Sequence, residues 1–484
     1  MMCDSNKILE STVERCRKRG IIIPTYEEMA HPEKIPQGIK EELKNIGLWD
    51  LHPRNLFRIT WKNEPVEFGG GFGDVNAIEI PPELSGVRAR ILILIGKYFP
   101  TGSHKVGATF GPLVEKLVKG AFDPTRQKAL WPSTGNYCRG GAYDSYLLAC
   151  PCIAVLPEGM SRERFEWLEK IGAEIHATPG SESNVKEVYD KTYELKRKRP
   201  DEIVVLNQFE EFGNAIWHYV CTGQAIEEVY EKERRGNQRL TALFLTQGST
   251  GTLGAADYLR VKICAGEALQ CPTLLYTGHG AHRIEGIGDK HVPWIHNLKN
   301  MDMAAGIDDE LCMRLVRLFN EPQGRRFLKS KGVPEEVVEK LDLLGISSIA
   351  NLIGAIKMAK YYEMNGNDIV FTIATDSMEL YRSRLEELRK DRGDYTNFQA
   401  AADLDSCLMA LTIDHMMELS YWDKKRIHNL KYFTWVEQMG KDVEELDRQW
   451  HDEDYWKEKY QSYRELDSRI KAFNEKTGLL DRYR

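Results

Sequence analysis

Four short segments of the chain combine residue types that can carry out chemistry. They are Pro-Thr-Gly-Ser-His-Lys at 100–105, Ser-Thr-Gly-Asn at 133–136, Gly-Ser-Thr-Gly-Thr at 248–252 and Gly-Ile-Ser-Ser at 345–348. The first segment ends in a lysine, whose neutral amine can form an imine with an aldehyde. The third is a glycine-rich turn, in which backbone N–H groups and hydroxyls can hold a phosphate. These two features predict a pocket for a phosphorylated aldehyde.

The predicted elements place Lys105 at the start of a helix. A strand-like run at 91–95 is followed by a short turn at 96–102, and a helix is expected to begin near 106. The positive end of the helix dipole disfavours a charged amine, and partial burial acts in the same direction. The neutral form that imine formation requires is therefore favoured. Taken alone, the segment also fits a surface lysine at a helix start.

The two serine-containing segments also precede predicted helices. Residues 133–136 follow a strand-like run at 129–131, and their hydroxyls and N–H groups would suit the α-carboxylate of an amino acid or simply cap the helix. A serine within 345–348 would face a buried ring nitrogen or cap the long apolar helix that follows. The glycines of segment 248–252 have neither the spacing of a Walker nucleotide-binding loop nor that of a dinucleotide-binding motif. Taken alone, the segment also fits a turn with a purely structural role. The four segments together predict a site for pyridoxal 5′-phosphate.

Strand-like runs alternate with amphipathic helices between residues 88 and 376. Strands are expected at 91–95, 129–131, 152–156, 174–177, 203–206, 242–245, 273–276 and 368–373. Helices are expected at 107–119, 140–148, 161–171, 185–198, 215–234 and 348–363. Such alternation predicts an α/β fold with parallel sheets covered by helices on both faces.

Three regions are expected along the chain. Residues 1–54 form an N-terminal arm, because their helical spacing is broken repeatedly by proline. Residues 55–376 form the catalytic core, with a smaller mobile subdomain at about 112–207. Residues 377–484 are highly charged, contain four tryptophans and predict a helical C-terminal extension. This extension would cover the active site or seal a subunit interface.

Composition limits the possible partners. The chain has 484 residues, of which 42% are hydrophobic and 29% charged, and its net charge of −7 predicts no binding to nucleic acid or anionic membranes. No apolar run approaches the ~18–20 residues of a membrane span. Ten scattered cysteines and the absence of a secretory signal in residues 1–19 predict a cytoplasmic location. Neither the Cys150/Cys152 pair nor His279 with His282 has further ligands at metal-site spacing, so no metal is expected.

Several segments resemble a known family in their order along the chain. Residues 133–136, 156–164, 172–174, 207–209, 222–223, 282–288 and 345–348 are similar to cysteine synthase and its relatives. The lysine segment at 100–105 is closer to the β subunit of tryptophan synthase. Both are fold-type II enzymes dependent on pyridoxal 5′-phosphate. The resemblance covers roughly residues 88–376 and implies two parallel-sheet subdomains with helices on both faces.

The resemblance implies roles for individual residues. Lys105 would hold the cofactor as an internal aldimine and later move the substrate's Cα proton, which makes it the expected catalytic residue. Contacts to the cofactor would come from Lys105, His104, Asn136, Gly248, Ser249, Thr250, Gly251, Thr252 and Ser347. The substrate carboxylate would be bound by Ser133, Thr134, Gly135 and Gln208.

The activity implied is β-replacement on a small L-amino acid through an aminoacrylate intermediate, in a homodimer. The same cofactor also permits β-elimination, of the serine/threonine dehydratase or cysteine desulfhydrase type, which releases ammonia and a keto acid. A non-catalytic partner subunit is a third alternative. Two departures from cysteine synthases leave the substrate open: Tyr137-Cys138 replaces a small Thr-Gly pair, and Thr250 replaces a glycine.

Overall fold

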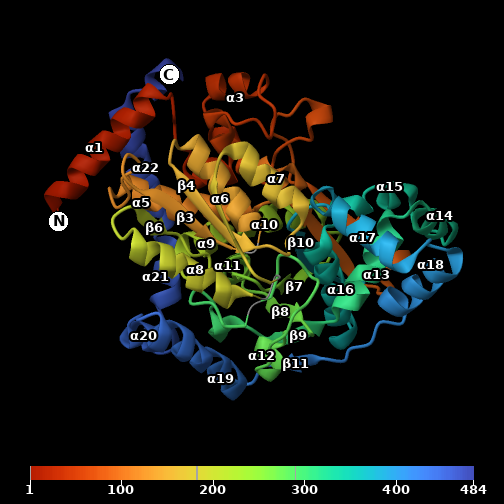
Figure 1. Cartoon of the computed structure of the whole chain (residues 1–484). Helices are drawn as coiled ribbons and strands as arrows, with labels where there is room; N and C mark the ends of the chain where they lie inside the picture. The colour runs from red at the N-terminus through yellow and green to blue at the C-terminus, as the bar shows by residue number, and fades with distance from the viewer. Residues whose placement is uncertain (1, 134, 181–183, 289, 484) are drawn as a thin grey trace.

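The strands of the protein form two separate sheets (Figure 1). A computed structural model describes residues 2–133, 135–180, 184–288 and 290–483. The strands are β1 (Ala77–Ile80), β2 (Arg90–Ile95), β3 (Lys128–Pro132), β4 (Cys152–Pro157), β5 (Glu174–Thr178), β6 (Ile203–Val205), β7 (Arg239–Thr246), β8 (Lys262–Ala268), β9 (Met303–Ile307), β10 (Asp368–Ala374) and β11 (Met416–Glu418). The larger sheet has the order β1-β2-β10-β7-β8-β9-β11, and the smaller has the order β5-β4-β3-β6.

Strand pairing confirms the predicted α/β class. All pairs of the smaller sheet are parallel. In the larger sheet the inner pairs are parallel, and only the edge strands β1 and β11 run antiparallel to their neighbours. The inner strands β2 and β10 are buried along their whole length, as expected when helices cover both faces of a sheet.

Twenty-two α-helices are assigned within the described residues. They are α1 (Met2–Lys18), α2 (Tyr26–Ala30), α3 (Gln37–Leu43), α4 (Pro82–Ser85), α5 (Lys105–Val118), α6 (Asn136–Leu147), α7 (Arg162–Ile171), α8 (Val185–Lys198), α9 (Phe212–Trp217), α10 (Gly223–Glu233), α11 (Leu253–Leu259), α12 (Thr273–Tyr276), α13 (Asp309–Asn320), α14 (Pro322–Ser330), α15 (Glu335–Val338), α16 (Ile346–Tyr361), α17 (Arg382–Arg392), α18 (Asn397–Leu404), α19 (Tyr421–Lys431), α20 (Val443–His451), α21 (Tyr455–Gln461) and α22 (Tyr463–Thr477).

The strand predicted at 273–276 was wrong, because this segment is the short helix α12. Glu267, in β8, causes the difference: its buried carboxylate accepts hydrogen bonds from the backbone N–H groups of Leu274 at 2.8 Å and Leu275 at 2.9 Å. Such bonds satisfy N–H groups that have no partner inside a helix start. The strand that precedes this helix is β8, at 262–268. The charged residues Lys262 and Glu267 flank its short apolar stretch, so the sequence pattern did not indicate a strand there.

The region after residue 377 is mostly helical but not entirely so. Residues 416–418 form β11, which pairs with β9 at the edge of the larger sheet. Three of the tryptophans in this region, Trp435, Trp450 and Trp456, are buried within the chain itself. Trp422 is 76% exposed. Most of the predicted apolar stripe is therefore covered by the chain's own core.

The beginning and end of the chain lie side by side, and Figure 1 shows α1 alongside α22. Arg17 donates a hydrogen bond to the carbonyl oxygen of Thr477 at 3.0 Å. The side chain of Asn474 accepts from the N–H of Ile23 at 3.1 Å and donates to its carbonyl oxygen at 2.8 Å. Hydrogen bonds thus join the N-terminal arm to α22.

No helix in the described part of the chain is long and apolar enough to span a bilayer. The same residues contain no group of three or more His, Cys, Asp or Glu side chains that would hold a metal ion. The two sheets match the two predicted parallel-sheet units, whereas the exact limits 1–54, 55–376, 112–207 and 377–484 stay predictions.

Candidate active site

Lys105 is the first residue of α5 and follows a sharp turn at the end of β2. Thr101 and Gly102 both have positive φ angles, 69° and 73°, which reverse the chain direction within two residues. The N–H of His104 donates to the carbonyl oxygen of Thr375, just beyond β10, at 3.3 Å. The turn is therefore fixed to the carboxyl end of the neighbouring parallel strand, where sites of open α/β sheets form.

The lysine reaches the glycine-rich loop at 248–252. Its Nζ donates to the Oγ of Ser249 at 3.1 Å. The same Oγ accepts a hydrogen bond from the Asn214 side chain at 3.0 Å, and that side chain also donates to the carbonyl oxygen of Gln208 at 3.0 Å. The structure thus brings together Lys105, Ser249 and the backbone of Gln208, which are far apart in sequence.

The loop at 248–252 has the features of a phosphate site. It connects β7 to α11, and the N–H groups of its residues 249–252 donate to no acceptor among the described residues. A Cβ atom added to Gly251 would lie 2.0 Å from the Asn214 side chain, so glycine is required there. Buried N–H groups must be satisfied. A bound phosphate would satisfy them.

Thr250 is held in a strained backbone conformation. Its φ angle of 62° lies in the left-handed region, which is a genuine outlier for a β-branched residue. We expect Thr250→Gly to raise the free energy of unfolding by about 0.5–1 kcal/mol, because relief of strain exceeds the added chain entropy. Thr252, the N-cap of α11 with a φ of −60°, is the matched control, and Thr252→Gly should lower stability by roughly a few tenths of a kcal/mol.

Denaturant titration of the two cofactor-loaded variants beside the wild-type protein measures both changes. An equal loss of stability in Thr250→Gly and Thr252→Gly would show that the left-handed conformation stores no strain.

Asn136 and Ser347 present buried polar atoms that lack protein partners. Asn136 begins α6, and its Nδ2 donates to the Oδ2 of Asp376 at 2.5 Å. The Oδ1 of Asn136 and the Oγ of Ser347, in the first turn of α16, are buried without a hydrogen-bond partner among the described residues. Such orphan atoms are rare unless a ligand supplies the partner. Together with the loop amides they fit a phosphorylated pyridine that carries a hydroxyl and a ring nitrogen.

The residues predicted to bind the substrate carboxylate lie at two places. Ser133 is buried, and its Oγ accepts from the N–H of Gly135 at 3.1 Å. Gln208 is also buried and is joined through its backbone to Asn214. Thr134 lies outside the described residues. No hydrogen bond within the described part of the chain joins Ser133 to Gln208, so their shared role stays a prediction.

His104 lies next to the lysine in a fully enclosed position. Burial, reinforced by the charge of Lys105, lowers the pKa of His104 to about 3, so the ring is neutral near pH 7. Its neighbours are the rings of His218, at 4.8 Å between centroids, and Trp61, at 5.6 Å. A neutral imidazole can donate to one group and accept from another, which suits a position close to a phosphate.

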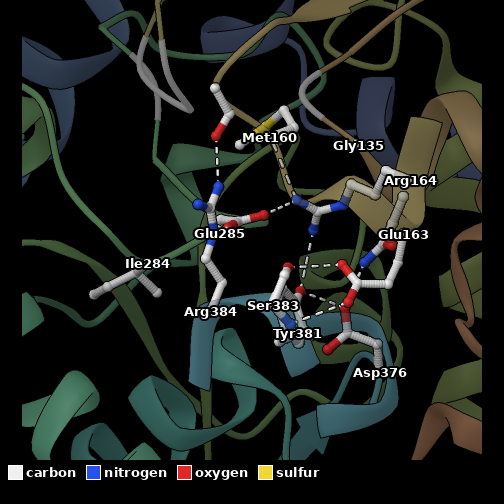
Figure 2. A network of polar contacts seen from close by, with 12 residues as sticks. Gly135, Met160, Glu163, Arg164, Ile284, Glu285, Asp376, Tyr381, Ser383 and Arg384 are labelled. Carbon is white, nitrogen blue, oxygen red and sulfur yellow. Dashed lines mark hydrogen bonds and ion pairs between the residues drawn. The ribbon is translucent and has the colours of Figure 1, made fainter. Parts of the chain in front are cut away.

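Sequence reasoning missed a polar network beside Asn136. Figure 2 shows Arg164, from α7, between Glu285 on one side and Tyr381 on the other. Arg164 forms a buried ion pair with Glu285 and donates to the hydroxyl of Tyr381 at 3.1 Å. Arg384 also pairs with Glu285, at 2.5 Å. We call Arg164, Glu285, Asp376, Tyr381 and Arg384 the arginine network.

The arginine network connects the two sheets at the site. The hydroxyl of Tyr381 donates to the Oδ2 of Asp376 at 2.7 Å, the same oxygen that holds Asn136. Burial raises the pKa of Asp376 above its usual range, against the opposing effects of Tyr381 and Arg164. A Cβ atom added to Gly135 would lie 2.5 Å from the Nε of Arg164. The network therefore fixes the position of both Gly135 and Asn136.

Comparison with protein families and curated proteins supports the same assignment. The family model described as pyridoxal-phosphate dependent enzyme matches residues 82–327. Cystathionine beta-synthase of Saccharomyces cerevisiae is 25% identical over 321 residues, which are 64% of this chain and 60% of that protein. Cysteine synthase of Staphylococcus aureus is 28% identical over 258 residues, which are 52% of this chain and 74% of that protein. The chain thus aligns with less than two thirds of the yeast relative.

Solved structures agree with the fold. O-acetyl serine sulfhydrylase isoform 3 from Entamoeba histolytica superposes with a TM-score of 0.55 at 24% identity, over 69% of this chain and 93% of that one. A hydrogen sulfide-producing enzyme from Fusobacterium nucleatum gives a TM-score of 0.53 at 22% identity, over 71% and 95% of the two chains. At these identities the structures establish the fold-type II architecture. With the family match over half its length, this chain belongs to the pyridoxal-phosphate dependent enzymes.

Proposed function

We propose that this enzyme catalyses β-replacement on a small L-amino acid, in the manner of cysteine synthase. The observation that carries the proposal is the contact between the Lys105 amine and Ser249 in a loop with free amides. The names of the curated relatives, cysteine synthase and cystathionine beta-synthase, support the same reaction class. The relatives do not decide the leaving group or the nucleophile, so both are left to experiment.

The residues of the site suit each part of that reaction. Bound pyridoxal phosphate supplies an electron-accepting ring that makes the Cα proton of an attached amino acid acidic. Residues 248–252 would bind its phosphate, Asn136 its hydroxyl and Ser347 its ring nitrogen. Asp376 fixes the Asn136 side chain through a 2.5 Å hydrogen bond and so orients the amide. In this assignment the arginine network positions the site and does not contact the reacting atoms.

Lys105 would act as the general base. Its place at the first position of α5 and beside Ser249 keeps the amine close to the phosphate loop. The helix dipole and partial burial favour the neutral amine, which can take the proton from the substrate Cα. Departure of the β-substituent would then be followed by addition of the nucleophile at the β-carbon, and Lys105 would return the proton to Cα.

The test uses the purified holoenzyme with O-acetyl-L-serine or L-serine, each with and without sulfide, and with L-cysteine alone as a substrate for elimination. β-Replacement predicts a new amino acid only when sulfide is present and a leaving group has been lost. Ammonia and a keto acid formed without sulfide would assign the chain to β-elimination instead. A purified protein with no cofactor absorbance after addition of pyridoxal phosphate would contradict both and favour the non-catalytic partner.

Assembly and location stay predictions. We propose a homodimer in the cytoplasm, in keeping with the resemblance to the family and with the scattered free cysteines.

A further inference from the structure

A cavity of about 750 Å³ lies between the core and the C-terminal helices, away from Lys105. We call it the junction cavity. Its walls come from the end of α11, the start of β8, the segment 297–302, and helices α19 and α21. The loop at 248–252 precedes the first residue of α11, whereas the junction cavity begins at the other end of that helix. Its volume is in the range of organic ligand sites.

Positive charge is concentrated in the junction cavity. Its lining includes Arg260, Lys262, Lys299, Lys424 and Lys457. The first four have no carboxylate oxygen within 4 Å among the described residues, and Lys457 has one only at 3.9 Å, from Asp454. The chain as a whole carries a net charge of −7. Lys424 donates to the carbonyl oxygen of Lys299 at 3.3 Å, and the Lys262 ammonium lies over the Tyr362 ring at 4.5 Å, but neither partner carries a negative charge. Cations without a carboxylate partner create a local field that attracts anions.

Three carboxylates line the cavity, and two of them, Asp257 and Asp302, accept hydrogen bonds from internal donors, whereas Glu453 is exposed. Asp257 accepts hydrogen bonds from Tyr460 at 2.5 Å, from Asn297 at 3.1 Å and from Asn300 at 2.5 Å. Asp302 accepts from the backbone N–H of Ile263 at 2.7 Å. These two acids hold the walls of the cavity together. With Glu453 they offset part of the positive charge, and because five cations face three carboxylates, the lining keeps a surplus of two positive charges.

Two further features indicate a built site. Asn297 is only 6% exposed, lines the cavity, and leaves its Oδ1 without a hydrogen-bond partner among the described residues. Tyr219 and Tyr460 stack with 4.7 Å between ring centroids and an interplanar angle of 6°, and Trp456 also lines the cavity. The lining therefore combines an aromatic wall with cations.

We propose that the junction cavity binds a phosphorylated organic molecule. Arg260, Lys299 and Lys424 hold the phosphate oxygens, for which a guanidinium and ammonium groups are suitable partners. The aromatic wall covers the organic part, and the Oδ1 of Asn297 accepts a hydrogen bond from it. Residues of both the core and the C-terminal helices form the cavity. A bound molecule therefore contacts both and also stabilises the packing of these helices against α11.

The experiment measures binding to the holoenzyme, in which pyridoxal phosphate already fills the first phosphate site. Calorimetric titrations with ATP, pyrophosphate and adenosine separate phosphate recognition from recognition of the organic part. We expect ATP to bind, pyrophosphate to bind more weakly, and adenosine alone to give no signal. Bound ATP should also raise the midpoint temperature of thermal unfolding, because a ligand stabilises the folded form that binds it.

A double variant tests the assigned residues. Arg260 has a left-handed backbone conformation with φ of 56°, which asparagine tolerates, so the variant is Arg260→Asn with Lys299→Gln. Loss of two charged donors should weaken ATP binding by at least about tenfold. Arg19→Gln with Lys390→Gln removes the same charge from exposed positions elsewhere and should leave the affinity unchanged.

The proposal is overturned if no probe binds to the wild-type holoenzyme. It is also overturned if the double variant binds ATP as tightly as the wild-type protein, or if adenosine binds as tightly as ATP. Cofactor absorbance and the unliganded thermal midpoint show whether the double variant is folded. Should it fail to fold, Lys424→Gln alone carries the test and is expected to weaken ATP binding by a few fold.

Discussion

Replacement of Lys105 by alanine is expected to reduce turnover by at least about a thousandfold, because the variant loses the amine that moves the Cα proton. The fold should persist, since the side chain is only partly buried and the turn at 100–104 is held by backbone contacts. Turnover is measured with whichever amino acid the substrate assays of the wild-type holoenzyme identify, and far-UV circular dichroism reports the fold. Reduction of the wild-type holoenzyme with borohydride should fix the cofactor on the peptide that contains Lys105.

The matched control is Lys119→Ala, at the opposite end of the same helix. Lys119 is exposed and forms an ion pair with Glu115 at 2.6 Å, so its loss should leave turnover within about twofold of the wild-type value. Undiminished turnover in Lys105→Ala, or a pyridoxyl adduct on another lysine, would remove Lys105 from its assigned role.

The second large effect is expected at the centre of the arginine network. Arg164 is fully buried, and Arg164→Met would keep much of its volume but leave Arg384 as the one charged partner of Glu285 among the described residues. Breaking a buried ion pair by removing one partner costs about 3–5 kcal/mol. We expect a loss near the lower limit, about 3 kcal/mol, because Arg384 still compensates part of the charge. The free energy of unfolding from guanidinium titration measures it.

Arg162→Met is the control from the same helix, because Arg162 is 66% exposed and pairs with Glu166 at 3.3 Å. Such surface pairs contribute about 0–1 kcal/mol. If the two variants lose equal amounts of stability, the arginine network does not hold the site together. A selective loss in Arg164→Met, accompanied by weaker cofactor binding, would show that the network positions Gly135 and Asn136 as well.

Local patterns in the sequence were sufficient to predict several of the elements that carry the site. The helix predicted at 185–198 matches α8, and the strands predicted at 91–95 and 368–373 match β2 and β10. Segments 100–105 and 248–252 were expected to share one pocket for a phosphorylated aldehyde. The structure places them in contact through Lys105 and Ser249, whereas their roles toward the cofactor stay predictions.

The arginine network could not be predicted because it has no local signal. Asn136 and Asp376 are 240 residues apart, and Arg164 and Glu285 are 121 residues apart. A buried arginine and an exposed one look alike in sequence, as Arg162 and Arg164 show. The helix α12 was missed for the same reason, since the carboxylate that starts it belongs to the preceding strand β8.

The hydrogen bonds between the N-terminal arm and α22 also affect the order in which the chain folds during its synthesis. Domains usually fold from the N-terminus as synthesis proceeds. Here the partners of Ile23 and Tyr26 are Asn474 and Asp467, which are synthesised 451 and 441 residues later. The segment that contains Ile23 and Tyr26 must therefore wait for these partners until α22 has been made. A stop codon before α22 would leave this segment without them and open to proteases.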